Sequence, residues 1–182
     1  MGMILILLCG YDTFETRFDL NEVYMTEIKV SSAILKDATE IGKIAFQTAQ
    51  IHYKALQNEF QNPTEETQID YIKKSILDKN ILVLKAEVDS KILGYTVVYF
   101  NTYLEQYFKF SKRGFIGSIG VDQNHRGKGI GQALLNGVET ELKKRGISVV
   151  EIDVYTFNHD AEKLYESFGY EDIKHYKRKF IE

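Results

Sequence analysis

A glycine-rich run constrains this chain more than any other feature of the sequence. It covers residues 118–131 and reads SIGVDQNHRGKGIG. The residues at 115–121 are mostly apolar, which predicts a strand, and Gly117 and Gly120 within it mark a bulge or the close approach of a ligand. After the run, apolar residues share one helical face, which predicts a helix over about 130–145: Ile130, Leu134, Leu135, Val138 and Leu142. The run is therefore predicted to turn a strand into a helix.

A turn of this composition can bind a phosphate group. Gly127, Gly129 and Gly131 have no side chains to block a ligand, so main-chain N–H groups can converge on an anion. The first turn of the helix adds free N–H groups and the positive end of the helix dipole. Arg126 and Lys128 can offset phosphate charge, Lys128 more through its amide than through its ammonium. The alternatives are a connection that needs only tight geometry and two solvated cations.

The spacing of the glycines excludes two common nucleotide-binding loops. A Walker A loop has Ser or Thr directly after its lysine, where this chain has Gly129. A GxGxxG dinucleotide fingerprint that begins at Gly127 needs Gly or Ala where Gln132 stands, and one that begins at Gly129 fails at Leu134. The pattern that remains is Arg126 followed by xxGxG.

A second motif covers residues 158–170 and reads NHDAEKLYESFGY. Asn158 suits the N-cap of a helix over about 159–168, and Gly169 suits its left-handed end. Alternating apolar residues predict a strand at 148–155 just before it. Helical spacing relates four residues of the motif: Ala161, Leu164, Tyr165 and Phe168. This part of the chain therefore reads as strand, phosphate loop, helix, strand and helix.

Together the two motifs resemble those of the GCN5-related N-acetyltransferase (GNAT) superfamily, whose acetyl-CoA loop has Arg or Gln followed by xxGxG or xxGxA. The second motif is similar to the NxxAxxLYxxxGF signature of that family, with Tyr170 in place of the usual Phe. The resemblance implies the α/β acyl-CoA N-acyltransferase (GNAT) fold, in which a mixed central β-sheet carries helices on both faces. The chain ends at residue 182, soon after Gly169, so one of the two closing strands of the family is expected to be short or missing.

The resemblance also implies a role for each matching residue. The cosubstrate would be acetyl-CoA, with no metal. Residues of the turn would hold its pyrophosphate: Arg126, Gly127, Lys128, Gly129, Ile130, Gly131 and Gln132. The preceding strand and the second motif would contact its pantetheine arm, through Ile119, Gly120, Val121 and Asn158.

Tyr165 would protonate the departing thiolate of coenzyme A, as the resemblance implies. A phenol with a pKa of about 10 stays protonated at neutral pH, so it can act as a general acid. The alternative is an aromatic residue packed under the sheet with its hydroxyl hydrogen-bonded elsewhere. The predicted function is acetyl transfer to a primary amine of a small molecule or protein, by direct attack in a ternary complex. The alternative function is a non-catalytic CoA-binding sensor or interaction module.

The general base is left open. An amine with a pKa of about 10.4 is neutral in roughly one molecule in two thousand at pH 7, so a base helps the reaction. Some relatives have Glu near the start of the strand before the turn, where this chain has Phe115. Asp122 is the nearest carboxylate, although it more readily caps a turn. Glu105, Glu151 and Asp153 are further candidates, and water or a main-chain carbonyl is the alternative.

The histidines are weaker candidates. His52 ends a predicted helix and is a candidate for lining an acceptor pocket. His125 adjoins the turn, where it either touches phosphate or is a solvated turn residue. No two histidines have the spacing of metal ligands.

Composition limits the class of protein. The 182 residues are 44% hydrophobic and 27% charged, which fits one globular domain with a sizeable core. The net charge of −3 argues against nucleic acid or a membrane surface as a partner. Cys9 is the only cysteine, so no disulfide can form within the chain, and a cytoplasmic location is expected.

The first 25 residues are predicted to be an appendage to an N-acetyltransferase domain at 26–182, with Met25 as the natural start. The apolar run at 3–8 is too short to span a membrane and lacks the basic start of a secretory signal. The alternative is an added strand or a homodimer contact. The next part of the chain is expected to form the acceptor side. It is predicted to contain a strand at 27–31, a helix capped by Asp37 that runs to about Tyr53, a second helix after Thr64, a hairpin of strands at 81–88 and 92–100, and a loop at 101–113.

Overall fold

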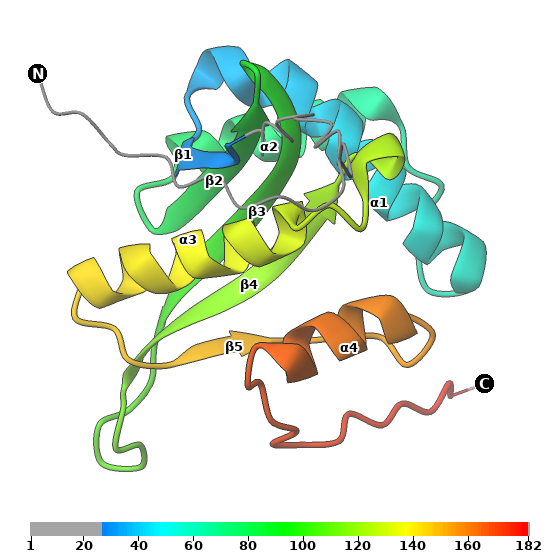
Figure 1. Cartoon of the computed structure of the whole chain (residues 1–182). Helices are drawn as coiled ribbons and strands as arrows, with labels where there is room; N and C mark the ends of the chain where they lie inside the picture. Colours follow the sequence, from blue (N-terminus) through cyan, green and yellow to red (C-terminus); the bar gives the residue numbers. More distant parts are fainter. Residues whose placement is uncertain (1–26, 182) are drawn as a thin grey trace, which may run out of the picture.

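Five strands form one mixed sheet in the computed structural model, which describes residues 27–181 (Figure 1). The strands lie in sequence order: β1 (Lys29–Ser32), β2 (Ile81–Val88), β3 (Lys91–Thr102), β4 (Lys112–Val121) and β5 (Val150–Ile152). Neighbouring strands from β1 to β4 are antiparallel, whereas β5 pairs with β4 in parallel. A parallel pair needs a crossover connection, which helix α3 (Ile130–Lys144) provides.

Helices cover both faces of the sheet. The first two, α1 (Ala38–Ala55) and α2 (Glu65–Leu77), pack on one face, and α3 packs with α4 (His159–Ser167) on the other. Side chains alternate along β2, so Leu82 and Leu84 enter the core under α3 whereas Val83 enters the core under α1. The expected α/β fold with a mixed central sheet is confirmed.

The helix predicted after the glycine-rich run is confirmed in detail. Its five apolar residues are between 0% and 3% exposed, and all belong to the core on that face of the sheet. The helix ends before Gly146, which has a φ of 68°, and the Ile147 amide closes the last turn by donating to the Leu142 carbonyl at 3.0 Å. Among the described helices, none is long and apolar enough to cross a membrane.

The two hairpins of the sheet differ in their turns. The predicted hairpin of β2 and β3 is confirmed, and its turn residues Asp89 and Ser90 have φ of 49° and 63°. Two positive φ values are typical of the two-residue turn whose twist matches that of the flanking strands. The loop predicted at 101–113 is shorter than expected, because β3 extends to Thr102 and β4 starts at Lys112.

The strand predicted at 148–155 is only partly correct. β5 has three residues and pairs only with residues 114–116 of β4. The two strands then diverge, so among residues 27–181 no strand continues the ladder with the chain after β5 (Figure 1). Within the described residues no strand follows α4, whereas the sequence led us to expect that only one of the two closing strands would be short or missing. Residues 1–25, the predicted appendage, lie outside the described part of the chain.

Asp37 does not cap α1 with its side chain, so that prediction is wrong. It stands at the N-cap position, but its carboxylate accepts a hydrogen bond from the Ile34 amide at 2.9 Å and pairs with Lys85 at 3.1 Å. Lys85 also lies 3.1 Å from Glu87. Burial opposes the charge of Lys85, but hydrogen bonds to Glu87 and Asp37 outweigh burial and raise its pKa. The carboxylate therefore links the 3-10 turn that precedes α1, whose N-cap is Ile34, to Lys85 of β2, and it does not cap the first turn of α1.

Replacing Lys85 with methionine is expected to lower the free energy of unfolding by about 3 kcal/mol, because it leaves the nearly buried Asp37 carboxylate without its cation. Urea denaturation measures the loss. The matched control is Lys73→Met, which breaks an exposed pair of 3.6 Å with Asp70 and should cost less than about 0.5 kcal/mol. Equal losses in the two variants would contradict a special role for the buried pair.

Candidate functional site

The glycine-rich run forms the predicted turn between β4 and α3. A short 3-10 helix, η2 (Gln123–His125), follows β4, and Gly129 is the N-cap of α3. Gly127 and Gly129 have φ of 73° and 80°, a left-handed conformation that bulky residues rarely adopt. The run therefore needs glycine at these two positions for its shape.

This turn carries main-chain donors that the described structure leaves without acceptors. Within the part of the chain that the structure describes, the N–H groups of residues 126–131 have no hydrogen-bond acceptor. A Cβ atom placed on Gly127 would meet no atom within 4 Å. Arg126 and Lys128 are exposed beside it, and Arg126 Nε donates to the Val121 carbonyl at 3.3 Å. Free amides at a helix N-terminus, flanked by two cations, fit a diphosphate group.

The end of β4 offers further main-chain groups on the side away from β3. Asp122 donates its N–H to the Leu93 carbonyl at 2.8 Å. N–H groups alternate in direction along an antiparallel strand, so those of Ile119 and Val121 point away from β3. The ladder with β5 ends at Ile116, before it reaches them. Within the described residues the N–H groups of Ile119 and Val121 therefore have no acceptor and are open to an extended ligand, whereas the Val121 carbonyl already accepts the hydrogen bond from Arg126. Both residues belong to the segment predicted to contact pantetheine.

The structure accounts for two of the three glycines of β4, Gly117 and Gly120. Gly117 lies where the register with β3 shifts, which is the predicted bulge. Gly120 lies against α1, since a Cβ atom there would be 2.4 Å from Thr48 Oγ1 and 2.6 Å from Tyr95 Cε1. The N–H and C=O groups of Gly120 point to β3, so they are used within the sheet. The element that closely approaches Gly120 is the helix α1.

The second motif packs against the first. α4 begins after its N-cap Asn158, whose Oδ1 accepts a hydrogen bond from the Ala161 amide at 3.4 Å. Among the described residues, the side-chain NH₂ group of Asn158 has no acceptor, so it remains a free donor. A Cβ atom on Gly131 would be 3.1 Å from Leu164 Cδ2, which shows how closely α4 approaches the start of α3. Gly169 ends α4 with a φ of 80°, as predicted.

Tyr165 follows Leu164 and is 7% exposed. Its ring centroid lies 5.7 Å from that of Tyr170, and both residues line a cavity of about 470 Å³ beside β5 and α4. Burial raises the pKa of Tyr165 to about 12. Within the described residues its hydroxyl makes no hydrogen bond, so the phenol is a protonated and uncommitted donor at neutral pH.

The candidate bases near the turn are already engaged. Asp122 Oδ1 lies 2.6 Å from His125 Nδ1, and Asp122 Oδ2 accepts a hydrogen bond from Gln47 at 3.1 Å. The hydrogen bond with His125, supported by that of Gln47, lowers the pKa of Asp122 despite partial burial. Asp122 thus caps η2, as the sequence favours, and Glu151 pairs with Arg113. The two remaining candidates are exposed: Glu105 and Asp153.

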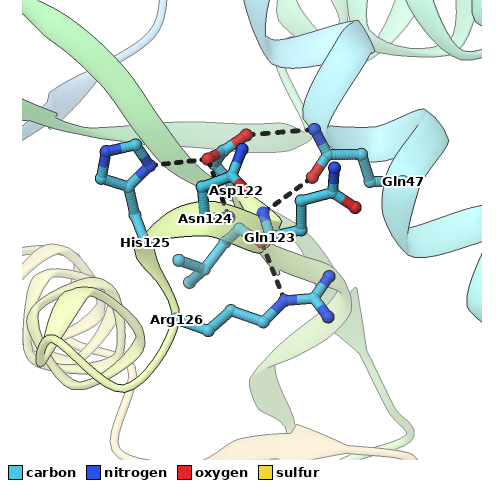
Figure 2. A network of polar contacts seen from close by, with 7 residues as sticks. Gln47, Asp122, Gln123, Asn124, His125 and Arg126 are labelled. Atoms are coloured by element: carbon cyan, nitrogen blue, oxygen red, sulfur yellow. Dashed lines mark hydrogen bonds and ion pairs between the residues drawn. The ribbon is translucent and has the colours of Figure 1, made fainter.

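Gln47 of α1 also contacts the turn, which the sequence does not predict (Figure 2). It bonds to Asp122 and to the main chain of Gln123, which follow it in the sequence by 75 and 76 positions. A glutamine on a helix has no sequence pattern that distinguishes such a contact from solvent exposure. Its role emerges only when α1 is placed beside the end of β4.

An aromatic cluster is the second feature that the sequence does not predict as a whole. It consists of His52, Phe60, Tyr155 and Phe157, and adjacent ring centroids lie between 5.4 and 5.7 Å apart. The cluster joins the end of α1 to the segment just before Asn158. Of its members only His52 is predicted from the sequence to line an acceptor pocket. The described residues contain no group of three His, Cys, Asp or Glu side chains placed to hold a metal ion.

Similar solved structures share this architecture. A mutant of a Bacillus halodurans protein has a TM-score of 0.77 at 23% identity, over 84% of this chain and 99% of that one. An aminoglycoside N-acetyltransferase in complex with CoA has a TM-score of 0.68 at 13% identity, over 84% of this chain and 95% of that one. At such identities the likeness establishes the fold alone.

Sequence comparison adds a family. The [Ribosomal protein bS18]-alanine N-acetyltransferase of Escherichia coli is 38% identical over 55 residues. That stretch spans 30% of this chain and only 37% of the length of the relative. The model of the Acetyltransferase (GNAT) family matches residues 47–170, which include both motifs, the turn and Gln47. Since this match covers more than half of the chain, the protein belongs to the GNAT acetyltransferase family.

Proposed function

We propose that this protein transfers the acetyl group of acetyl-CoA to a primary amine of a small molecule or a protein. The observation that carries the proposal is the row of N–H groups at 126–131 that have no acceptor within the described residues. It continues a path that starts with the open N–H groups of Ile119 and Val121. Such a path suits a ligand in which a diphosphate is followed by an extended arm that contains amide groups. Family membership and the acetyltransferase names of two similar proteins support the same chemistry.

The reaction needs few groups of the protein. The neutral amine attacks the thioester carbonyl, a C–N bond forms, and the C–S bond breaks as the electron pair moves to sulfur. The open N–H of Ile119 or Val121 stabilises the charge that develops on the carbonyl oxygen. Tyr165 donates its proton to the departing sulfur, and the proton released by the amine passes to water. The single cysteine, Cys9, lies outside both motifs, so direct transfer needs no covalent enzyme intermediate.

The acceptor is proposed to enter beside the aromatic cluster. Phe157 of the cluster directly precedes Asn158, and His52 lies on the same helix as Thr48, which packs on Gly120 of β4. The cluster therefore lies beside the predicted pantetheine contacts. Its exposed member Tyr155 is 40% accessible, so an acceptor can reach these rings from solvent.

Release of free thiol from acetyl-CoA tests the function. The full chain is incubated with acetyl-CoA and a panel of amines: peptides with N-terminal alanine, lysine peptides, aminoglycosides and polyamines. The expected result is thiol release that depends on one class of amine, with an acetylated product of the correct mass. CoA binding without release for any amine would favour the non-catalytic module. Failure of the protein to bind CoA at all would exclude both the acetyltransferase function and the non-catalytic CoA-binding module.

A further inference from the structure

Gln47 joins the helix on one face of the sheet to the turn at the end of β4. Its Nε2 lies 3.1 Å from Asp122 Oδ2, and its Oε1 accepts a hydrogen bond from the Gln123 amide at 2.9 Å. Figure 2 shows the side chain reaching from α1 to both partners, with the His125 ring on the opposite side of Asp122. One carboxamide therefore fixes two successive residues of the chain that leads into the predicted phosphate site.

The chemistry of the partners fixes the orientation of this carboxamide. An ionised carboxylate only accepts hydrogen bonds and a main-chain N–H only donates them. The NH₂ end of Gln47 must therefore face Asp122, and its oxygen must face Gln123. The ionised state of Asp122 is in turn stabilised by His125 at 2.6 Å. No other side chain of the same length combines a donor and an acceptor in this way.

The contact has a defined position in the fold. The next residue of α1, Thr48, packs on Gly120, two residues before Asp122. Close packing of Thr48 on Gly120 and the two hydrogen bonds of Gln47 thus hold α1 against the end of β4. Asp122 caps the 3-10 helix at the start of the turn and Gly129 caps α3 at its end, so the position of Asp122 sets one end of the segment that leads to the free N–H groups. The same helix carries His52 of the aromatic cluster.

We propose that Gln47 is a positioning residue for the pyrophosphate-binding turn. It acts through Asp122 and Gln123, and it holds the N–H groups of residues 126–131 in the arrangement that a diphosphate needs. The inference rests on the proposed function, since it assumes that the turn binds CoA. It predicts a defect that is confined to the diphosphate end of the donor.

The test uses Gln47→Met, which keeps the length of the side chain and removes both hydrogen bonds. CoA affinity, measured by calorimetry on the full chain, is expected to fall about tenfold, which corresponds to about 1.4 kcal/mol. Thiol release with saturating acetyl-CoA is expected to keep its kcat, so the loss appears in KM. With acetylpantetheine, a donor without the diphosphate, kcat/KM is expected to match that of the unmodified protein.

Two comparisons make the result decisive. Gln50→Met replaces a second glutamine of α1 and should leave CoA affinity unchanged. Gln47→Glu keeps the acceptor for Gln123 but sets a second carboxylate against Asp122, so it should bind CoA at least as weakly as Gln47→Met. Unchanged CoA affinity in Gln47→Met, or equal losses with acetyl-CoA and acetylpantetheine, would overturn the positioning role. Absence of CoA binding by the unmodified protein would instead overturn the proposed function.

Discussion

Replacing Gly129 with valine is expected to weaken CoA binding by at least about 100-fold. Gly129 has a φ of 80°, which a β-branched residue adopts only with strain, so the turn must change its shape. It is also the N-cap of α3, where the free N–H groups of the turn and the helix meet. Each hydrogen bond to a charged group contributes about 1.5–3 kcal/mol, and losing two such bonds accounts for the expected loss. Calorimetry with CoA measures it.

The chain offers a matched control for this variant at the other end of the same helix. Gly146 has a φ of 68°, and a Cβ atom there would meet no atom within 4 Å, so Gly146→Val introduces similar backbone strain far from the turn. Both variants should lower the melting temperature, whereas only Gly129→Val should lose CoA. Normal CoA affinity in Gly129→Val would refute the phosphate-binding role of the turn.

Replacing Tyr165 with phenylalanine is expected to lower kcat about 100-fold and to leave the affinity for CoA unchanged. The ring keeps its packing in the core, and only the proton donor is lost. The thiolate must then leave without an acid. Steady-state thiol release at saturating acetyl-CoA and amine measures the effect, and full turnover would remove the acid assignment.

Tyr170→Phe is the control for Tyr165→Phe. Tyr170 lies 5.7 Å from Tyr165, and within the described residues its buried hydroxyl has no hydrogen-bond partner. Removing that hydroxyl should leave kcat unchanged and should not lower stability, because no hydrogen bond is broken. A large loss of kcat in Tyr170→Phe with none in Tyr165→Phe would transfer the acid role to Tyr170.

The pH profile of the unmodified protein follows from the same residue. Tyr165 is active as the protonated phenol, and its raised pKa of about 12 moves its ionisation to higher pH. Turnover should therefore not fall between pH 7 and about 10 through this group. It should rise instead, because more of the acceptor amine becomes neutral. A basic limb that falls near pH 9 and disappears in Tyr165→Phe would contradict the raised pKa.

Local patterns predicted the parts of the fold that depend on neighbours in the sequence. The buried stripe of α3, the left-handed glycines and the hairpin at Asp89 and Ser90 each follow from a few adjacent residues. The length of β5 was mispredicted, because the alternation at 148–155 does not reveal where β4 diverges. Asp37 was misassigned for a similar reason, since its partner Lys85 lies on a distant strand.

The residues of the candidate site also differ in whether neighbouring sequence positions reveal them. The turn and the second motif are contiguous in the sequence, so their residues were identified there as candidates. Gln47 and the aromatic cluster come from elements that meet only in the folded chain, and neither has a recurring spacing. The sequence could not decide the general base for the same reason. Asp122 and Glu151 are candidates in the sequence, but their contacts with His125 and Arg113 are visible only in the folded chain.

The position of Gly129 couples ligand binding to the stability of the whole molecule. The helix that it caps contributes five nearly inaccessible residues to the main core. A ligand that binds the turn at the start of this helix is therefore expected to stabilise the core as well. A ligand at 100 times its dissociation constant adds about 2.7 kcal/mol to the free energy of unfolding. Thermal melts in the presence of different acyl-CoA molecules would therefore rank donors by affinity before any acceptor amine is known.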